Sequence, residues 1–146
     1  EKASLLCMPG GGSRIPATTD SVEAGLHHLQ MDGKETFKNA VNAMMSAATE
    51  ALRRCEIDIS QIKLVIPHQA NRRIIDAVGE RLGVQPDQVF VNLDKYGNTS
   101  AASVAIALDE AVEQGRLKRG DLALLVVFGA GLTWAAAGKT LISTAR

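Results

Sequence analysis

The run from residue 122 to residue 128 is nearly all apolar, and it constrains the fold more than any other part of the chain. A strand without a polar face must be covered on both sides, so this run predicts the central strand of a sheet between two layers of helices. Gly129-Ala130-Gly131 then leads into a second strand, expected over residues 132–142. With 146 residues, of which 46% are apolar, the chain can bury such a core within one domain.

Shorter apolar runs alternate with amphipathic segments ahead of this strand. Apolar residues at helical spacing predict one helix over residues 34–54 and another over residues 70–82, which Gly83 ends as a C-cap glycine. Short strands are expected at residues 64–66 and 89–91. The order of the elements predicts an α/β fold in which a mixed five-stranded sheet has helices on both faces.

The N-terminal part of the chain differs in composition from the rest. Residues 4–8 predict a short strand, and residues 9–33 are rich in Gly, Pro, Ser and Thr without a sustained period, which predicts a long loop. We therefore expect one domain over residues 1–146, in which residues 1–33 form a strand plus loop region and residues 34–146 form the α/β core.

A third predicted helix, over residues 99–114, has almost no polar face in its first half. A helix that is small and apolar all round is usually buried on more than one side. We expect this helix to lie between two layers, where its alanines and serines permit close approach.

The charge balance and the cysteine content exclude several classes of function. Sixteen basic and sixteen acidic residues leave no net field that favours nucleic acid or a membrane surface, and no apolar run approaches the roughly 20 residues that cross a bilayer. Cys7 and Cys55 lie far apart, without a CxxC or Cys/His cluster, so we expect no metal site and a reducing, cytoplasmic location.

Two polar side chains stand where predicted strands end. His68 follows Pro67 at the end of one apolar run, and Asn98 follows the next run after a polar stretch. A neutral imidazole and a carboxamide can both donate hydrogen bonds to one carbonyl oxygen, which suits the stabilisation of an enolate or oxyanion. The backbone N–H groups of Gly129, Ala130 and Gly131 could form a further oxyanion hole.

A structural role is the alternative for each of these residues. A histidine at a strand end can serve only as a hydrogen-bonding residue of the scaffold, and Gly97-Asn98 is also common turn chemistry. Ser100 and Ser103 are expected to cap or pack the following helix, since no GxSxG elbow surrounds them.

Several motifs together resemble a known family. They are Met31-Asp32-Gly33-Lys34-Glu35-Thr36-Phe37-Lys38, Pro67-His68-Gln69-Ala70-Asn71-Arg72-Arg73-Ile74, Asn92 to Ser103 and Phe128-Gly129-Ala130-Gly131-Leu132-Thr133-Trp134. In order and spacing they are similar to the C-terminal half of beta-ketoacyl-[acyl-carrier-protein] synthase III. The resemblance implies the C-terminal half of a thiolase-like fold, in which two similar halves pack as αβαβα layers.

The resemblance also implies an activity. Such enzymes start fatty acid synthesis by condensing acyl-CoA with malonyl-acyl carrier protein and releasing CO2, as homodimers that need no cofactor. By match of motif, His68 and Asn98 hold the malonyl thioester oxygen as the enolate forms, while a cysteine in the N-terminal half carries the acyl group. Arg73 and Lys38 match positions that dock the acidic carrier protein. Glu80 and Ala130 depart from the family pattern, at the docking patch and in the glycine turn.

Neither cysteine of this chain suits the nucleophile. Cys55 falls near a predicted helix C terminus, where the helix dipole does not favour a thiolate, and Cys7 precedes a loop. We expect both to be structural and the chain alone to be inactive without the N-terminal half. The alternatives are a noncatalytic module that binds acyl carrier protein or acyl-CoA through Arg73, Lys38 and the basic turn at residues 116–119, or a family member with a different acyl acceptor.

Overall fold

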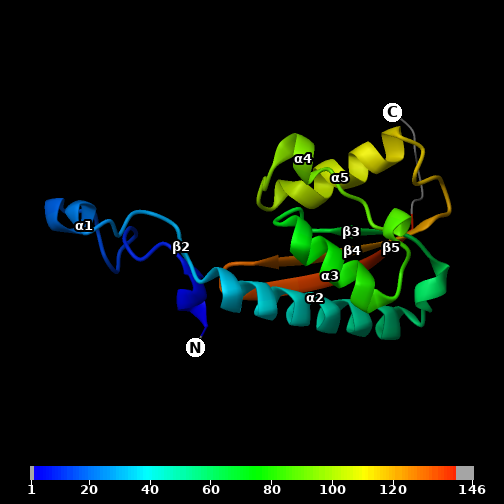
Figure 1. Cartoon of the computed structure of the whole chain (residues 1–146), viewed down its shortest axis with the longest axis horizontal. Helices are drawn as coiled ribbons and strands as arrows, with labels where there is room; N and C mark the ends of the chain where they lie inside the picture. Colours follow the sequence, from blue (N-terminus) through cyan, green and yellow to red (C-terminus); the bar gives the residue numbers. More distant parts are fainter. Residues whose placement is uncertain (1, 141–146) are drawn as a thin grey trace.

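The computed structural model describes residues 2–140, which form a layered α/β body preceded by an extended N-terminal arm (Figure 1). In chain order the elements are η1 (Ala3–Leu5), β1 (Leu6–Cys7), α1 (Thr19–Glu23), β2 (Gln30–Met31), α2 (Gly33–Cys55), η2 (Ile59–Gln61), β3 (Ile62–Pro67), α3 (Arg72–Leu82), η3 (Pro86–Gln88), α4 (Leu93–Tyr96), α5 (Ala102–Glu113), β4 (Leu122–Gly129) and β5 (Thr133–Thr140).

The sheet of the α/β body has the strand order β3-β4-β5. β3 and β4 run parallel, with Val65 opposite Leu124, and β4 and β5 run antiparallel, with Leu125 opposite Ala137. The sheet is therefore mixed, and the apolar run is its central strand, as predicted. The expected end of β5 at residue 142 lies outside the described residues.

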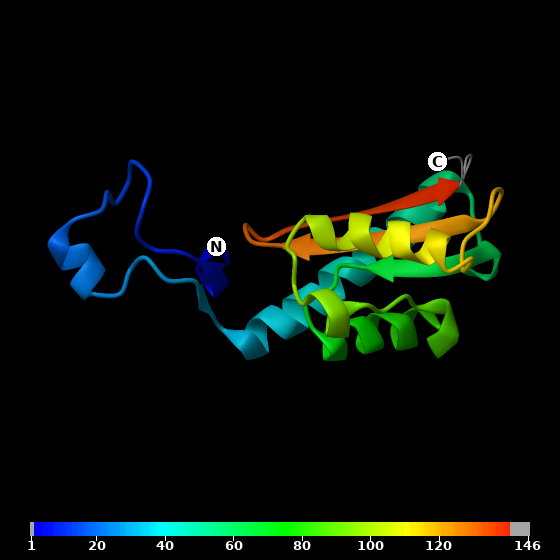
Figure 2. The ribbon, with the colours of Figure 1, turned by 90° about the horizontal axis from the view of Figure 1, so that it is seen from above.

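Helices cover both faces of this sheet, as predicted (Figures 1 and 2). On one face α2 and α3 pack against alternate strand residues, and Met44 and Val78 are among the buried side chains of this layer. On the other face α5 packs on the sheet, and Ala107, Ala111 and Leu64 belong to one buried cluster there. The two faces alternate along β4 because successive strand side chains point to opposite sides.

The long helices confirm the periodicity argument. α2 starts one residue before and ends one residue after the expected range, with the Asp32 side chain accepting a hydrogen bond from the Glu35 N–H at its N-terminus. α3 begins at Arg72, not at residue 70, because the Asn71 side chain caps it. Gly83 ends α3 in the left-handed conformation (φ 72°), as predicted.

The prediction of a strand at residues 89–91 is wrong. Val89 makes only an isolated parallel bridge to Val65, and the Phe90 N–H donates to the Val65 carbonyl. Directly afterwards the Asn92 N–H donates to the Gln69 side chain, so the chain leaves the sheet and enters α4, which the sequence had not indicated. The strands of residues 2–140 divide between two sheets, since β1 and β2 form an antiparallel pair of their own.

The N-terminal arm reaches away from the α/β body (Figure 2). It is mostly irregular, as expected, but it contains α1, whose Thr18 cap forms a capping box with Ser21. Large apolar side chains of the arm are exposed, namely Met8, Val22, Leu29 and Met31. Within the described chain the arm thus leaves much of its apolar surface uncovered.

α5 differs from its expected form in two ways. It starts at Ala102, because Gly97 and Ser100 adopt positive φ (66° and 52°) and keep the preceding residues out of the helix. It is buried on one face in this chain, while Ala102 and Ala105 are exposed. The prediction of burial on more than one side is not met by residues 2–140, in which only the sheet face of α5 is covered.

Candidate functional site

His68 lies directly after β3, at the end of the sheet where β4 also finishes. Its backbone N–H donates to the Val126 carbonyl at 2.8 Å, so the β3–β4 ladder holds its main chain in place. The side chain is half-buried, and Nδ1 lies 2.6 Å from Ser103 Oγ. Burial lowers the pKa of the His68 imidazole below its usual value of 6.5, because it disfavours the charged ring. The ring is therefore neutral at pH 7, and Nε2 is free of hydrogen bonds within the described residues.

Asn98 is exposed in the segment that leads into α5. Its Oδ1 accepts a hydrogen bond from the Ser100 N–H at 3.0 Å, which is the turn chemistry that the sequence offered as the alternative role. This bond occupies the carboxamide oxygen and leaves the Nδ2 amide as a donor. The turn role and the donor role are therefore compatible in one residue.

The turn Gly129-Ala130-Gly131 begins at the last residue of β4, at the same edge of the sheet as His68, since β3 and β4 are parallel. Gly131 has φ 133°, and a Cβ there would meet Thr133 Cγ2 at 2.9 Å, so glycine is required at this position. Ala130 does not have a positive φ and is exposed, so the alanine is tolerated in the middle of the turn.

Ser103 joins these parts of the edge. It belongs to the first turn of α5, five positions after Asn98, and its hydroxyl contacts the His68 ring. The structure thus ties His68 to the helix that the Asn98 segment enters. The prediction that Ser103 caps or packs the helix missed this contact, which spans 35 positions of the chain.

A buried amide supports the segment behind His68. Gln69 is 1% exposed; its Nε2 donates to the carbonyls of Pro67 (2.8 Å) and Phe90 (3.2 Å), and its Oε1 accepts from the Asn92 N–H (3.0 Å). All polar atoms of its carboxamide are therefore engaged within the protein. Gln69 ties the end of β3 to residues 90–92, so it is a scaffold residue that sequence reasoning did not single out.

Glu110 extends this polar network beneath α4. Its carboxylate accepts hydrogen bonds from Asn92 Nδ2 and Gln114 Nε2, each at 2.8 Å, and from Lys95 Nζ. The Lys95 and Asn92 side chains hold the pKa of the Glu110 carboxyl below its usual value of 4.5. The network anchors residues 92–95, which precede Asn98, to α5. An acidic residue on the otherwise apolar face of a predicted helix was the signal that could have revealed it.

The predicted docking residues lie on neighbouring helices. The Arg73 guanidinium stacks over the Phe37 ring, 5.4 Å from its centroid, and Phe37 directly precedes Lys38. Arg73 and Lys38 are both exposed, so their charges face solvent. In the basic turn, by contrast, Arg116 stacks on Phe90 and donates to the Asp87 carbonyl, which engages its side chain in the fold.

The two cysteines belong to elements other than those that carry the candidate site. Cys7 is in β1, with Sγ 3.7 Å from the Ser4 carbonyl, and Cys55 is the exposed last residue of α2. Neither stands at a helix N-terminus, where a thiolate is favoured. Over residues 2–140, no group of three or more His, Cys, Asp or Glu side chains is placed to hold a metal ion, and none of the helices has both the length and the apolar character needed to span a bilayer.

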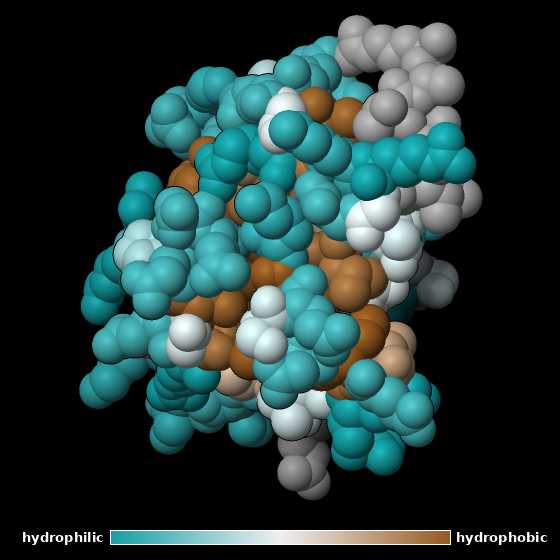
Figure 3. Space-filling model, turned by 90° about the vertical axis from the view of Figure 1, so that its right-hand side faces the viewer, coloured by the Kyte–Doolittle hydropathy of each residue, from teal (hydrophilic) through white to brown (hydrophobic). Residues whose placement is uncertain are grey.

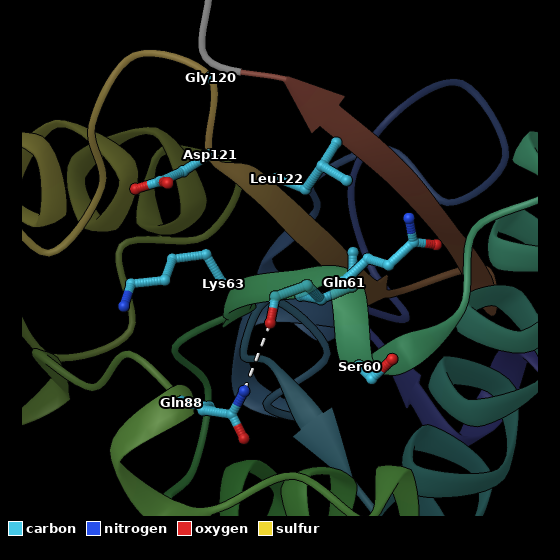
Figure 4. A pocket seen from close by; sticks show the side chains of 8 residues that line it. Ser60, Gln61, Lys63, Gln88, Gly120, Asp121 and Leu122 are labelled. Carbon is cyan, nitrogen blue, oxygen red and sulfur yellow. Dashed lines mark hydrogen bonds between the residues drawn. The ribbon is translucent and has the colours of Figure 1, made fainter.

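A hollow of about 460 Å³, whose lining side chains are drawn in Figure 4, lies at the opposite ends of β3 and β4 from His68. Its lining residues are Ser60, Gln61, Ile62, Lys63, Gln88, Gly120, Asp121 and Leu122. Figure 3 shows apolar side chains between polar ones on the side of the molecule where the described chain finishes. None of the predicted site residues lines this hollow, so the candidate site remains the edge that holds His68.

Comparison with known proteins gives consistent matches over most of the chain. Residues 52–139 match the protein family described as 3-oxoacyl-[acyl-carrier-protein (ACP)] synthase III C terminal. The chain is 58% identical over 130 residues to beta-ketoacyl-[acyl-carrier-protein] synthase III of Caldanaerobacter subterraneus. This match covers 89% of the chain and 39% of the relative. It is 54% identical over 137 residues to the protein of the same name from Roseiflexus sp., and this match covers 94% of this chain and 42% of the relative.

Solved structures agree with the sequence matches. The crystal structure of beta-ketoacyl-[acyl carrier protein] synthase III from Thermus thermophilus superimposes with a TM-score of 0.81 at 44% identity, covering 99% of this chain and 43% of that one. The chain therefore spans about two fifths of the length of the curated relatives and of the solved structure that it matches.

Proposed function

Since the chain belongs to the beta-ketoacyl-[acyl-carrier-protein] synthase III family and corresponds to its C-terminal part, we propose that it supplies the enolate-stabilising half of a condensing enzyme. Its α/β fold is the C-terminal half of the thiolase-like fold of these enzymes. The proposed reaction is the decarboxylative Claisen condensation of acyl-CoA with malonyl-acyl carrier protein, in the cytoplasm and without a cofactor.

The proposal rests on two neutral side chains. In each of them one polar atom makes a hydrogen bond within the protein, and another is left as a donor. His68 has Nδ1 against Ser103, which leaves Nε2 for a ligand, and Asn98 has Oδ1 on the Ser100 N–H, which leaves Nδ2. As CO2 leaves the malonyl group, the electrons of the broken C–C bond spread onto the thioester oxygen. Two donors aimed at that oxygen stabilise the enolate without an ion pair.

The lowered pKa of His68 supports a role as a donor more than as a general acid. Because burial keeps the ring neutral at pH 7, His68 can polarise the thioester oxygen but carries no extra proton to quench the carbanion. The carbanion then attacks the acyl thioester held on a cysteine, and the thiolate leaves. The backbone N–H groups of residues 129–131 stand at the same edge and are proposed to receive the second developing oxyanion.

The nucleophilic cysteine is proposed to come from the N-terminal half of the same enzyme. Cys7 lies in a strand and Cys55 at a helix C terminus, so neither stands at the start of a helix, where a thiolate is favoured. The exposed alanines of α5 fit the same proposal, since small side chains allow another helix to approach closely. The chain alone is then inactive in condensation, and complete subunits are proposed to pair as a homodimer.

Carrier-protein docking is assigned to Arg73 and Lys38. Both charges are exposed, and the stacking of Arg73 on Phe37 holds its guanidinium beside α2, which carries Lys38. An acidic carrier protein would be steered to this face by its charge. Glu80 is exposed on the same helix as Arg73 and reduces the positive field there.

The proposal is tested in the complete enzyme by His68→Ala and Asn98→Ala. Each change should slow decarboxylation of malonyl-acyl carrier protein by a factor on the order of 100 or more, which is the cost of losing one oxyanion donor. Acyl transfer to the cysteine should change far less. His28→Ala is the matched control, since His28 lies in the N-terminal arm. If both variants decarboxylate malonyl-acyl carrier protein at the wild-type rate, the roles proposed for His68 and Asn98 are wrong.

A second candidate, a noncatalytic module that binds acyl carrier protein, is favoured by the exposed Arg73 and Lys38 and by the unsuitable cysteines. Carrier-protein binding by the chain, with no condensation on addition of any cysteine-bearing half, would support it. A different acyl acceptor would appear instead as a different product when the complete enzyme is offered a panel of acyl-CoAs and malonyl thioesters.

A further inference from the structure

Ser103 makes two hydrogen-bonding contacts with the segment that carries His68. Its side chain is 2% exposed, and its Oγ lies 2.6 Å from His68 Nδ1 and 3.3 Å from the Gln69 backbone nitrogen. Both partners lie at the end of β3, while Ser103 belongs to α5. One buried hydroxyl therefore connects two elements at the candidate site.

The number of protons available decides which atom donates in each contact. The Gln69 backbone N–H can only donate, so the Ser103 oxygen accepts that bond. The Ser103 hydroxyl proton then needs an acceptor, because an unsatisfied buried hydroxyl costs free energy. Within the described residues, the other hydrogen-bonding contact of this hydroxyl is His68 Nδ1, which accepts when it carries no proton.

This assignment determines the tautomer of His68. In a neutral imidazole one nitrogen is protonated and the other is not. If Nδ1 accepts from Ser103, the ring proton is on Nε2, the nitrogen that has no hydrogen-bond partner among residues 2–140. Nε2 is then a donor, which is the form that can stabilise an oxyanion; the opposite tautomer would present a lone pair and repel it.

We propose that Ser103 is a positioning residue that holds His68 in the Nε2–H tautomer and in a fixed ring orientation, so that the imidazole donates to the substrate oxygen. The inference rests on the proposed function and deepens it. Because Ser103 stands on the helix that follows Asn98, the same contact also sets the position of the His68 ring relative to the segment that carries the second donor.

The direct test is 15N NMR of the histidine rings in the complete enzyme, with His68→Gln used to identify the His68 signals. We expect the chemical shift of an unprotonated, hydrogen-bonded Nδ1 and a protonated Nε2. In Ser103→Ala, the Nδ1 signal should move and the tautomers should mix. A protonated Nδ1 in the unaltered enzyme would overturn the proposal, whatever the activity of the variants.

Kinetics provide a second test. Ser103→Ala should lower kcat for decarboxylation about tenfold or more, with KM changed less than about twofold, because the substrate still binds while the donor is misplaced. Ser103→Thr keeps the hydroxyl and should recover most of the rate. Thr36→Val, which removes another buried hydroxyl with its bond to the Leu5 carbonyl, is the control for a general loss of stability and should leave the rate unchanged.

The outcomes separate this inference from the proposed function. If His68→Ala abolishes decarboxylation but Ser103→Ala has no effect on kcat, the positioning role is wrong and the role of His68 stands. If His68→Ala has no effect, the proposed function is wrong. Should Ser103→Ala fail to fold, the tautomer in the unaltered enzyme and the rate of Ser103→Thr still decide the question.

Discussion

Gly79, in the middle of α3, leaves no room for a side chain. A Cβ at this position would lie 2.7 Å from Val89 Cγ2, and it would also approach Val89 Cβ at 3.8 Å and Val84 Cγ2 at 3.9 Å. Carbon atoms in contact prefer about 3.5–4.0 Å, so Gly79→Ala requires Val89 to move. Val89 cannot move easily, because its N–H donates to the Pro86 carbonyl and its backbone bridges to Val65.

Two opposing effects set the expected magnitude. Replacing glycine by alanine within a helix contributes about 0.5–1 kcal/mol of stability. Overpacking a filled core by one methyl group costs about 1–3 kcal/mol. We therefore expect Gly79→Ala to lower the free energy of unfolding by about 1–2 kcal/mol, which corresponds to roughly 2–8 °C in Tm for a chain of this size.

The assay is thermal and urea unfolding followed by circular dichroism. Gly33→Ala is the matched control, since no atom lies within 4 Å of a Cβ there, and its stability should be unchanged or slightly higher. In the double variant with Val89→Ala, the clash is relieved, so the two substitutions should couple by about 1–2 kcal/mol in the stabilising direction. Equal stability of Gly79→Ala and Gly33→Ala, or strict additivity with Val89→Ala, would refute the packing argument.

Three further predictions concern charge. Burial lowers the pKa of His68 below 6.5, so Nδ1 takes up a proton, and gives up the bond from Ser103, only as the pH falls below 6.5. The His68-dependent part of the pH–rate profile for decarboxylation, found by comparison with His68→Gln, should therefore change only below that pH, and a change above pH 7 would contradict this. Lys95 and Asn92 lower the pKa of Glu110, so its stabilising contribution is present above pH 4.5 and is lost as the pH falls below that value. Glu110→Gln should therefore flatten the dependence of stability on pH below pH 4.5 in urea titrations. Arg73→Glu should raise KM for malonyl-acyl carrier protein about tenfold and leave KM for acyl-CoA unchanged, whereas Lys118→Glu should alter neither.

Local patterns in the sequence predicted the long elements well. α2 and α3 follow from apolar residues at helical spacing, and Gly83 ended α3 because a left-handed C-cap favours glycine over any other residue. β4 follows from its apolar run, since only a central strand covered on both faces needs no polar side. These features depend on interactions within a few residues or on burial alone.

Several of the failures involve contacts between distant segments, and the others involve caps and turns at helix starts. The run at residues 89–91 has the composition of a strand, but Gln69 takes up the Phe90 carbonyl and the Asn92 N–H, so ladder formation stops after one bridge. The late start of α5 depends on the positive φ of Ser100, and α4 depends on the anchoring of Lys95 and Asn92 by Glu110. The contacts of Gln69 and Glu110 join residues 15 or more positions apart, so no local pattern carries that information.

The sequence by itself determined the α/β class, the central strand and the two polar residues at strand ends, and its motifs pointed to the family to which the chain belongs. Only the tertiary structure decided what those residues can do. His68 becomes a candidate donor because Ser103, 35 positions away, occupies Nδ1, and Asn98 presents its amide because Ser100 occupies Oδ1. The physical reason is that the strand and helix patterns arise from backbone geometry and burial, whereas the tautomer of a ring depends on the one atom that folding places beside it.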